Sequence, residues 1–362
     1  MVPLLANFRK NSIFVLNENY KTIPNMKKLF LLLVMVGLCA TTFAQSRQKA
    51  QSIIFETDMG NDIDDAMALD ILFKYVDMGK INLLGVGVHK NNPHSAEFID
   101  IMRTWYGHKK TAIGVNTACV TDMNCVDYCT KTCQMKNKNG EPMFARSKNP
   151  KYEEAVEMYR RLLAKQPDKS VVIVTVGFST TIAELLKSGP DKYSKLSGME
   201  LVKQKVEFFS IMAGEFAIKD FAEYNVWNDL EAARHFFENS PVPMVYTPWI
   251  LGDQIQYPGE SIENDFGWAP EHPMVEAYKA YNQMPYDRPT WDVIAAYYAC
   301  DPTLPVFQLG EAGDIKVEGK GITKLTPNAN GLSRVLVPNE TQRKQILDSF
   351  IKLLTTKPKN KK

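Results

Sequence analysis

A cluster of aspartates directly after an apolar run constrains this chain more than any other feature. The segment FETDMGNDIDDAMAL, residues 55–69, places Asp58, Asp62, Asp64 and Asp65 within eight positions. Carboxylates this close in a partly buried turn repel one another, so they cannot all stay ionised without a cation or a set of hydrogen-bond donors. The fold around this turn therefore has to satisfy an unusual concentration of negative charge.

Helix capping accounts for part of the cluster, because Asp62 or Asp64 suits the N-cap of the helix predicted next and acidic residues are favoured in a first turn. Capping leaves Asp58 and Asp65 without a reason. Hard carboxylate oxygens around a turn are the ligands that calcium and magnesium prefer. An EF-hand loop is excluded, since Leu69 holds the twelfth position from Asp58. The cluster therefore favours a metal site of another kind.

Apolar runs alternate with helical patterns along the chain, which predicts an α/β fold with a mostly parallel central β-sheet flanked by helices. The predicted strands are 52–57, 81–88, 111–115, 170–176, 206–212 and 243–247. The predicted helices are 64–76, 95–107, 151–165, 179–189 and 229–240, with Gly107 and Gly189 as stop signals. Ligands of such sheets bind beyond the carboxyl ends of the strands, which is where the first strand delivers the aspartates.

Residues 26–44 carry a basic start, an apolar stretch and small residues before Ala44, which is typical of a secretory signal. Residues 1–25 are interpreted as an upstream extension, 45–356 as a single domain and 357–362 as a basic tail. No later stretch reaches the roughly 20 apolar residues of a membrane span. We expect an exported protein, periplasmic or secreted after cleavage near Ala44. The net charge of +2 gives no argument for nucleic acid.

Cysteines cluster in the longest irregular segment, residues 117–150, at Cys119, Cys125, Cys129 and Cys133. In an exported protein such a cluster first predicts disulfides, with the pairing open. The spacing of four among the last three would place them on one helical face, so a soft-metal site is the alternative, although no histidine accompanies them in the sequence. Cys300 is expected to be a buried small hydrophobic residue.

The segment FETDMGNDIDDAMAL resembles the D-T-D-x-G-x-D-D-A-x-A-L signature of the inosine-uridine preferring nucleoside hydrolase family. Further blocks follow in that family's order: HKNNPHSAEFIDIMRTWYG, VVIVTVGFSTTIAELL, MAGE, AEYNVWNDLEAARHFF and RPTWDVIAAYYA. The resemblance implies a calcium-dependent N-ribohydrolase that acts on a nucleoside or riboside. It also implies a homo-oligomer, a dimer or a tetramer.

The resemblance assigns roles residue by residue. Asp58 matches the aspartate that holds calcium and acts as general base on the attacking water. Asp65, Asp292 and the carbonyl of Val176 match further calcium ligands. The positions that match substrate-binding residues are Asp64, Asn92, Met212, Glu223 and Asn225. From the residues alone, AEYN is read as an extended segment in which Glu223 and Asn225 point the same way, with a helix entry as the plainer alternative.

Two departures from the family pattern matter. The segment GNDIDDA is two residues longer than the usual signature, so Asp62 is a candidate metal ligand in place of Asp64 or Asp65. Trp291 precedes Asp292, where many members carry a histidine that protonates the leaving base. Trp291 is therefore either a core aromatic or a residue that stacks on the leaving group.

Two functions of other classes compete with the hydrolase. One is a calcium-dependent sugar- or nucleoside-binding protein that has lost efficient turnover. The other is a metal-dependent phosphohydrolase. Two features of the sequence argue against it: it has no convincing glycine-rich loop to bind phosphate, and Glu56 stands where a D-x-D motif would begin.

Overall fold

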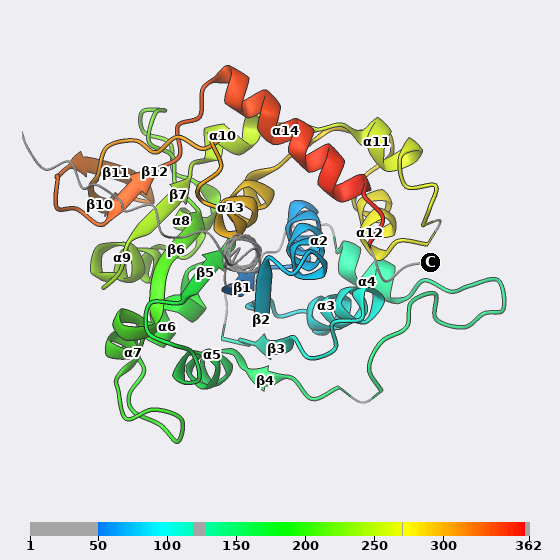
Figure 1. Cartoon of the computed structure of the whole chain (residues 1–362), viewed down its shortest axis with the longest axis horizontal. Helices are drawn as coiled ribbons and strands as arrows, with labels where there is room; N and C mark the ends of the chain where they lie inside the picture. The colour runs from blue at the N-terminus through cyan, green and yellow to red at the C-terminus, as the bar shows by residue number, and fades with distance from the viewer. Residues whose placement is uncertain (1–49, 119–126, 149, 270, 359–362) are drawn as a thin grey trace, which may run out of the picture. The chain divides into compact units, whose positions relative to one another are not determined.

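The structure is a computed structural model that describes residues 50–118, 127–148, 150–269 and 271–358, within a compact unit spanning Lys49–Lys362 (Figure 1). Its centre is a ten-stranded sheet in the order β11-β10-β12-β7-β6-β5-β1-β2-β3-β4. The strands are β1 (Gln51–Thr57), β2 (Ile81–Val88), β3 (Ala112–Val115), β4 (Glu153–Glu154), β5 (Val171–Thr175), β6 (Val206–Met212), β7 (Met244–Thr247), β10 (Gly313–Glu318), β11 (Ile322–Pro327) and β12 (Ser333–Val335). A separate antiparallel pair joins β8 (Gln256–Tyr257) to β9 (Arg288–Pro289).

Helices cover both faces of the sheet. They are α2 (Asp64–Asp77), α3 (Pro93–Tyr106), α4 (Tyr128–Cys133), α5 (Ala155–Ala164), α6 (Thr180–Lys187), α7 (Gly198–Lys205), α8 (Tyr224–Asn228), α9 (Leu230–Asn239), α10 (Trp249–Asp253), α11 (Gly259–Asn264), α12 (Pro273–Tyr281), α13 (Trp291–Cys300) and α14 (Glu340–Thr355). One core lies under α2, α3 and α13, and a second lies under α5, α6, α7 and α9 (Figure 1).

The sheet is parallel from β4 to β12, and only β10 pairs in the antiparallel sense, with β11 and β12. This arrangement confirms the predicted α/β fold. The chain builds β1, β2, β3 and β4 in one direction and then returns to place β5 on the other side of β1. Loops after β1 and β5 consequently diverge, which leaves a crevice at the carboxyl ends of these two strands.

Several boundaries differ from the prediction for local reasons. The helix expected from residue 151 begins at Ala155, because Glu153–Glu154 pair with β3 as β4. Gly107 ends α3 in the left-handed conformation, with φ of 81°, as predicted. Gly189 is not the stop of α6, which ends at Lys187 with an extended Ser188. The strands β10 to β12 and the helix α14 were not among the predicted elements.

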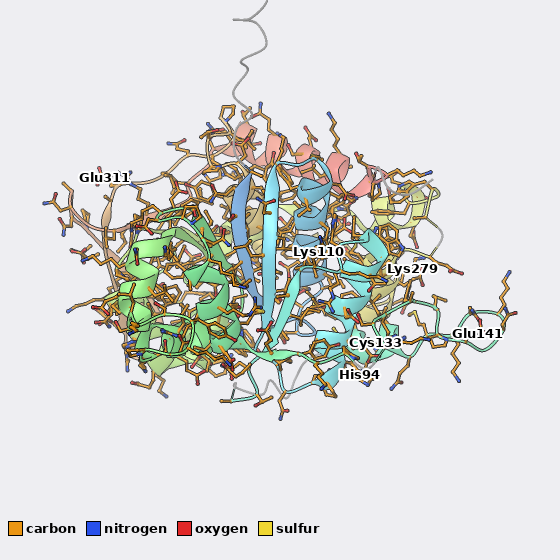
Figure 2. All side chains as sticks on the ribbon, turned by 60° about the horizontal axis from the view of Figure 1, so that its bottom comes forward. His94, Lys110, Cys133, Glu141, Lys279 and Glu311 are labelled. Carbon is orange, nitrogen blue, oxygen red and sulfur yellow. The ribbon has the colours of Figure 1, made fainter. Side chains whose placement is uncertain are left out.

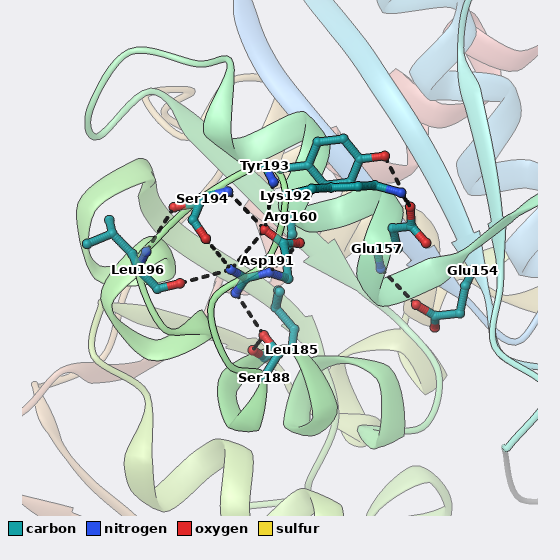
Figure 3. A network of polar contacts seen from close by, with 10 residues as sticks. All are labelled: Glu154, Glu157, Arg160, Leu185, Ser188, Asp191, Lys192, Tyr193, Ser194 and Leu196. Carbon is teal, nitrogen blue, oxygen red and sulfur yellow. Dashed lines mark hydrogen bonds and ion pairs between the residues drawn. The ribbon is translucent and has the colours of Figure 1, made fainter.

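The outside of the sheet assembly carries charged side chains, among them Lys110, Glu141, Lys279 and Glu311 (Figure 2). The side chain of Arg160, in contrast, is buried. Arg160 of α5 donates from Nε to Asp191, at 2.8 Å, and from its terminal nitrogens to Ser188 Oγ and the Leu196 carbonyl (Figure 3). This buried guanidinium fixes the irregular segment between α6 and α7 to α5.

None of the helices in the described ranges is long and apolar enough to cross a membrane. The predicted secretory signal and the segment upstream of it lie outside the described residues. Cys119 and Cys125 lie outside them as well. Cys129 and Cys133 are buried free thiols, so the disulfides first expected from the cluster do not form at these two positions. Cys300 is buried in α13, as predicted.

Candidate active site

The turn between β1 and α2 is shaped by backbone contacts rather than by helix capping. Gly60 has φ of 107°, a region that favours glycine, and its N–H donates to the Tyr128 hydroxyl at 3.0 Å. The N-cap of α2 is Ile63, which has no side-chain capping bond. Neither Asp62 nor Asp64 caps this helix, so that part of the capping explanation is wrong, whereas Asp64 and Asp65 do lie in the first turn, as it predicts.

Four carboxylates meet where α2 packs against α13. Asp58 follows β1, Asp64 and Asp65 open α2, and Asp292 lies in the first turn of α13. All four are buried, with exposed fractions of 5% or less. Asp64 Oδ2 accepts the backbone N–H of Asp292 at 2.9 Å, and the Thr57 hydroxyl donates to Asp65 Oδ1. Asp65 Oδ2 is buried without a hydrogen-bond partner among the described residues.

Burial is the first cause that raises the pKa values of Asp64, Asp65 and Asp292, and repulsion from the neighbouring carboxylates adds to it. Burial also raises the pKa of Asp58, although His89 and Lys90 oppose this effect. Such a group of buried oxygens is stabilised in its ionised form by a divalent cation. The donor set and the orphaned oxygen of Asp65 therefore fit a hard metal ion.

A cavity of about 290 Å³ opens above these carboxylates, at the carboxyl ends of β1, β5 and β6. Its lining residues are Asp58, Asn61, Asp62, Asp64, Asp65, Val176, Met212, Glu223, Tyr224, Asn225, Trp249, Tyr281, Trp291 and Asp292. The lining combines polar groups with aromatic rings, which suits a ligand with a hydroxylated part and a flat part. All but one of the sequence-predicted site residues line this cavity.

Three of the predicted substrate residues form one connected wall. Asn225 Nδ2 donates to the Val176 carbonyl at 3.0 Å and lies 3.4 Å from Met212 Sδ. Glu223 is buried and accepts the backbone N–H groups of Asn225, Gly214 and Val226. Glu223 is the N-cap of α8, so the extended reading of AEYN is wrong and the helix entry is what forms.

Burial raises the pKa of Glu223 to about 7, against the opposing effect of its three amide donors. A carboxyl group with this pKa changes its charge near neutral pH. The wall of the cavity therefore contains one group whose charge depends on pH in that range.

The two remaining polar candidates are directed elsewhere. Asp62 lies at the rim, where both its oxygens bind the guanidinium of Arg288, with Nε to Oδ1 at 2.8 Å. Asn92 is not among the cavity-lining residues. It is the N-cap of α3, accepts the His94 N–H at 2.9 Å and donates to Asp127 at 2.9 Å.

Trp291 is one of the aromatic residues that line the cavity, with Trp249 and Tyr281. Its Nε1 donates to the Trp249 carbonyl at 2.8 Å, and the two rings lie 6.3 Å apart. The Arg288 guanidinium lies over the Trp291 ring at 5.4 Å and over the Tyr281 ring at 5.0 Å. Trp291 is thus a half-buried residue that lines the cavity and also packs against the hydrophobic core.

Four lining residues were not predicted from the sequence: Asn61, Tyr224, Trp249 and Tyr281. Position offers a signal for two of them, because Asn61 lies inside the acidic turn and Trp249 directly follows β7 at the carboxyl edge of the sheet. Tyr224 adjoins the predicted Glu223. Tyr281, at the end of α12, has no local signal, since α12 reaches the site only through tertiary packing.

Comparisons with known proteins agree with this geometry. The family model described as inosine-uridine preferring nucleoside hydrolase matches residues 53–347. No curated protein matches the sequence. Among solved structures, a plant nucleoside hydrolase, PpNRh1, is 17% identical, with a TM-score of 0.61 over 85% of this chain and 99% of that one.

A purine-preferring ribonucleoside hydrolase from Gardnerella vaginalis is 17% identical, with a TM-score of 0.63 over 84% of this chain and 98% of its own. An inosine-uridine preferring nucleoside hydrolase from Bacillus anthracis is 16% identical, with a TM-score of 0.57 over 84% of this chain and 99% of that one. These likenesses show the shared fold, and the family match extends over most of the sequence. The chain therefore belongs to the inosine-uridine preferring nucleoside hydrolase family and is an N-glycosyl hydrolase.

Proposed function

We propose that this chain is an exported, calcium-dependent hydrolase that cleaves ribonucleosides to ribose and free base, with Asp58 as general base. The observation that carries the proposal is the group of four buried carboxylates in a cavity that aromatic rings also line. The hydroxyl groups of a ribose suit the polar part of this lining, and a flat base suits the rings.

Asp58, Asp65 and Asp292, with the carbonyl of Val176, are the residues we assign to the calcium ion. Each of the four supplies an oxygen atom as ligand, and all four residues line the cavity. When bound, calcium supplies positive charge that makes water a stronger acid and attracts vicinal hydroxyl oxygens of the sugar. We leave Asp62 out of this set, because Arg288 already occupies both its oxygens.

Cleavage of an N-glycosidic bond develops positive charge on the sugar ring, in an oxocarbenium-like transition state. Asp58 takes the proton of the attacking water, and its carboxylate is oriented by Asn61 Nδ2, which donates to Asp58 Oδ2 at 3.1 Å. Asp64, Glu223 and Asn225 bind the sugar hydroxyls. The remaining negative charge in the cavity stabilises the ring as it becomes cationic.

We assign the leaving base to the aromatic rings of the lining, those of Trp291, Trp249 and Tyr281. Stacking on these rings holds a flat group but cannot protonate it. Among the described residues that line the cavity there is no histidine. Burial raises the pKa of Tyr281 to about 12, so its hydroxyl stays protonated at neutral pH and is available as a hydrogen-bond donor to the base.

We assign Asn92 an indirect part in this function, because its contacts hold the start of α3 to Asp127 rather than reaching the cavity. The chain is further proposed to assemble as a homo-oligomer, a dimer or a tetramer, which light scattering after size exclusion measures. Its small-molecule partner is a nucleoside or a related riboside.

The test is release of reducing sugar from purine and pyrimidine ribonucleosides and from an activated nitrophenyl riboside, with added calcium or with a chelator. We expect calcium-dependent release that falls by about 100-fold or more in Asp58→Asn, since general-base catalysis contributes at least that factor. Asp348→Asn changes an exposed aspartate of α14 in the same way and serves as the matched control.

Calorimetric titration of calcium and of a nucleoside accompanies the assay. Sugar release that survives chelation would refute the role of calcium. Binding of calcium and nucleoside without any release would instead identify a binding protein that has lost turnover. If the activated riboside is cleaved much faster than the nucleosides, protonation of the leaving base limits the rate of nucleoside cleavage.

A further inference from the structure

We propose that His94, Glu97 and Cys133 form a second metal site, which takes a zinc-class divalent ion and lies outside the catalytic cavity. None of the three residues lines that cavity, and the site is independent of the hydrolase chemistry proposed above. The sequence places a cysteine cluster here without a neighbouring histidine. The fold supplies the histidine from another helix.

The three donors come together because α3 packs against α4. His94 and Glu97 lie three residues apart near the start of α3, so they share one face of the helix. Cys133 is the last residue of α4. One ligand atom of each residue lies within 4.8 Å of the other two, and Figure 2 shows His94 and Cys133 side by side at the lower edge of the molecule.

The site is a hollow with its thiol at the base. The Cys133 residue is 4% exposed, while the side chains of His94 and Glu97 are 29% and 26% exposed. Met135 and Arg146 form part of its wall. An ion can therefore enter from solvent, pass the imidazole and the carboxylate, and reach a buried sulfur.

An imidazole nitrogen, a carboxylate oxygen and a thiolate are the ligands of zinc, and three of them with an open fourth position make a recognised zinc geometry. Calcium prefers oxygen alone, so this donor set separates the second site from the carboxylates of the cavity. His94 Nδ1 and Glu97 Oε2 now lie 2.6 Å apart. Tetrahedral zinc needs its nitrogen and oxygen ligands about 3.3 Å apart, which a small rotation of either side chain provides.

Arg146 holds the carboxylate in place for this purpose. Its guanidinium binds Glu97 Oε1 and donates to the Cys133 carbonyl at 2.8 Å, which leaves Oε2 for the ion. Partners of this kind, outside the ligand shell, orient metal-binding carboxylates. The carboxylate of Glu97 and the thiolate of Cys133 neutralise the two charges of the ion, and the charge of Arg146 remains.

A proton leaves when the ion binds. Cys133 Sγ lies 3.6 Å from the His94 carbonyl, to which the thiol donates, and burial raises the pKa of this thiol. Binding replaces the S–H bond by a sulfur–metal bond, and the thiol proton goes to solvent. Zinc affinity should therefore rise with pH.

The experiment titrates the EDTA-stripped full chain with Zn²⁺ against a chromogenic zinc indicator, and in parallel with Co²⁺, whose thiolate complex has a charge-transfer band. We expect one tight zinc equivalent and a cobalt band that Cys133→Ser abolishes. His94→Gln should weaken zinc by about tenfold or more. His108→Gln is the matched control, because His108 is a half-exposed histidine that also contacts a carboxylate, that of Asp77.

Thermal unfolding supplies a second readout in case Cys133→Ser folds poorly. Zn²⁺ should raise the Tm of the wild-type chain and of His108→Gln but not that of His94→Gln. A wild-type chain without a cobalt band would overturn the proposal, as would a band that persists in Cys133→Ser or an equal loss in both histidine variants. Asp65→Asn should keep the cobalt band while losing calcium, so failure at one site does not imply failure at the other.

Discussion

Asp62 differs from the other aspartates of its turn in what its side chain touches. Arg288 binds both its oxygens with a planar fork, and the guanidinium also lies over the rings of Tyr281 and Trp291. Among the described residues, no arginine contacts Asp58, Asp64 or Asp65, and all three are buried. The two extra residues in the acidic turn thus provide an anchor for a cationic rim residue.

We predict that Asp62→Asn leaves calcium affinity within about threefold of wild type, because the amide still contacts Arg288 and no proposed ligand is lost. Asp65→Asn should weaken calcium by about tenfold or more, since one oxygen of a buried charged ligand becomes a nitrogen. Isothermal calorimetry of both variants at one pH measures the difference. Equal losses in the two variants would make Asp62 a ligand.

Glu223 gives a prediction for stability against pH. Its pKa is about 7 in the fold and about 4.5 when exposed, so its contribution to stability is complete below pH 4.5 and is lost as pH rises through 7. The limit of this effect is about 3 kcal/mol. Glu223→Gln cannot ionise, and its free energy of unfolding should fall less between these pH values than that of wild type.

Urea unfolding of wild type and Glu223→Gln at several pH values measures how the free energy of unfolding of each protein changes with pH. The variant also loses acceptors for backbone N–H groups, but that loss is a constant offset that does not depend on pH. Parallel curves for the two proteins would contradict a raised pKa at Glu223.

At the scale of helices and strands, the sequence predicts most of the elements that arise from a local hydrophobic pattern. Six apolar runs become β1, β2, β3, β5, β6 and β7, and the residues that end them, such as Asp58 and Val176, line the cavity. What it cannot predict depends on distant packing. Tyr281 reaches the site because α12 packs on α2, and His94 meets Cys133 because α3 packs on α4. Strand β10 does alternate polar and apolar residues, a signal that the prediction overlooked, whereas β11 alternates weakly and β12 has only three residues.

The contact between α10 and α13 depends on a glycine. A Cβ at Gly252 would come within 1.9 Å of Trp291 Cδ1 and 2.7 Å of its backbone, so any side chain must displace Trp291. We predict that Gly252→Ala destabilises the fold by about 1–3 kcal/mol and raises KM for nucleosides. Calcium affinity should fall as well, because the proposed ligand Asp292 directly follows Trp291, but by less than if Asp58 or Asp65, which lie on other elements, were displaced.

The matched control is Gly267→Ala, where a Cβ meets nothing within 4 Å. Thermal unfolding and steady-state kinetics of both variants measure the effect. If Gly252→Ala kept the KM of wild type while losing stability, Trp291 would serve packing alone and would not contact the leaving base.

At the scale of the whole chain, the site is assembled from residues far apart in sequence. Asp58 and Asp292 are separated by most of the chain, yet the reversal of strand order beside β1 brings both to one crevice. Because α2 and α13 pack together, the buried charges of one helix face those of the other. Their repulsion is a property of the complete fold, and we expect calcium to stabilise the whole domain rather than one loop.

Export is the remaining property that concerns the chain as a whole. The apolar run between Lys28 and Thr41 is too short for a comfortable span and is followed by small residues up to Ala44, so we predict cleavage after Ala44. Leu33→Arg should block export, because a charge in the apolar stretch prevents its insertion. Leu5→Arg, upstream of Met26, should not. Mass spectrometry of the exported protein should give a chain that starts at Gln45, and an intact residue 26–44 segment in the exported fraction would refute the signal.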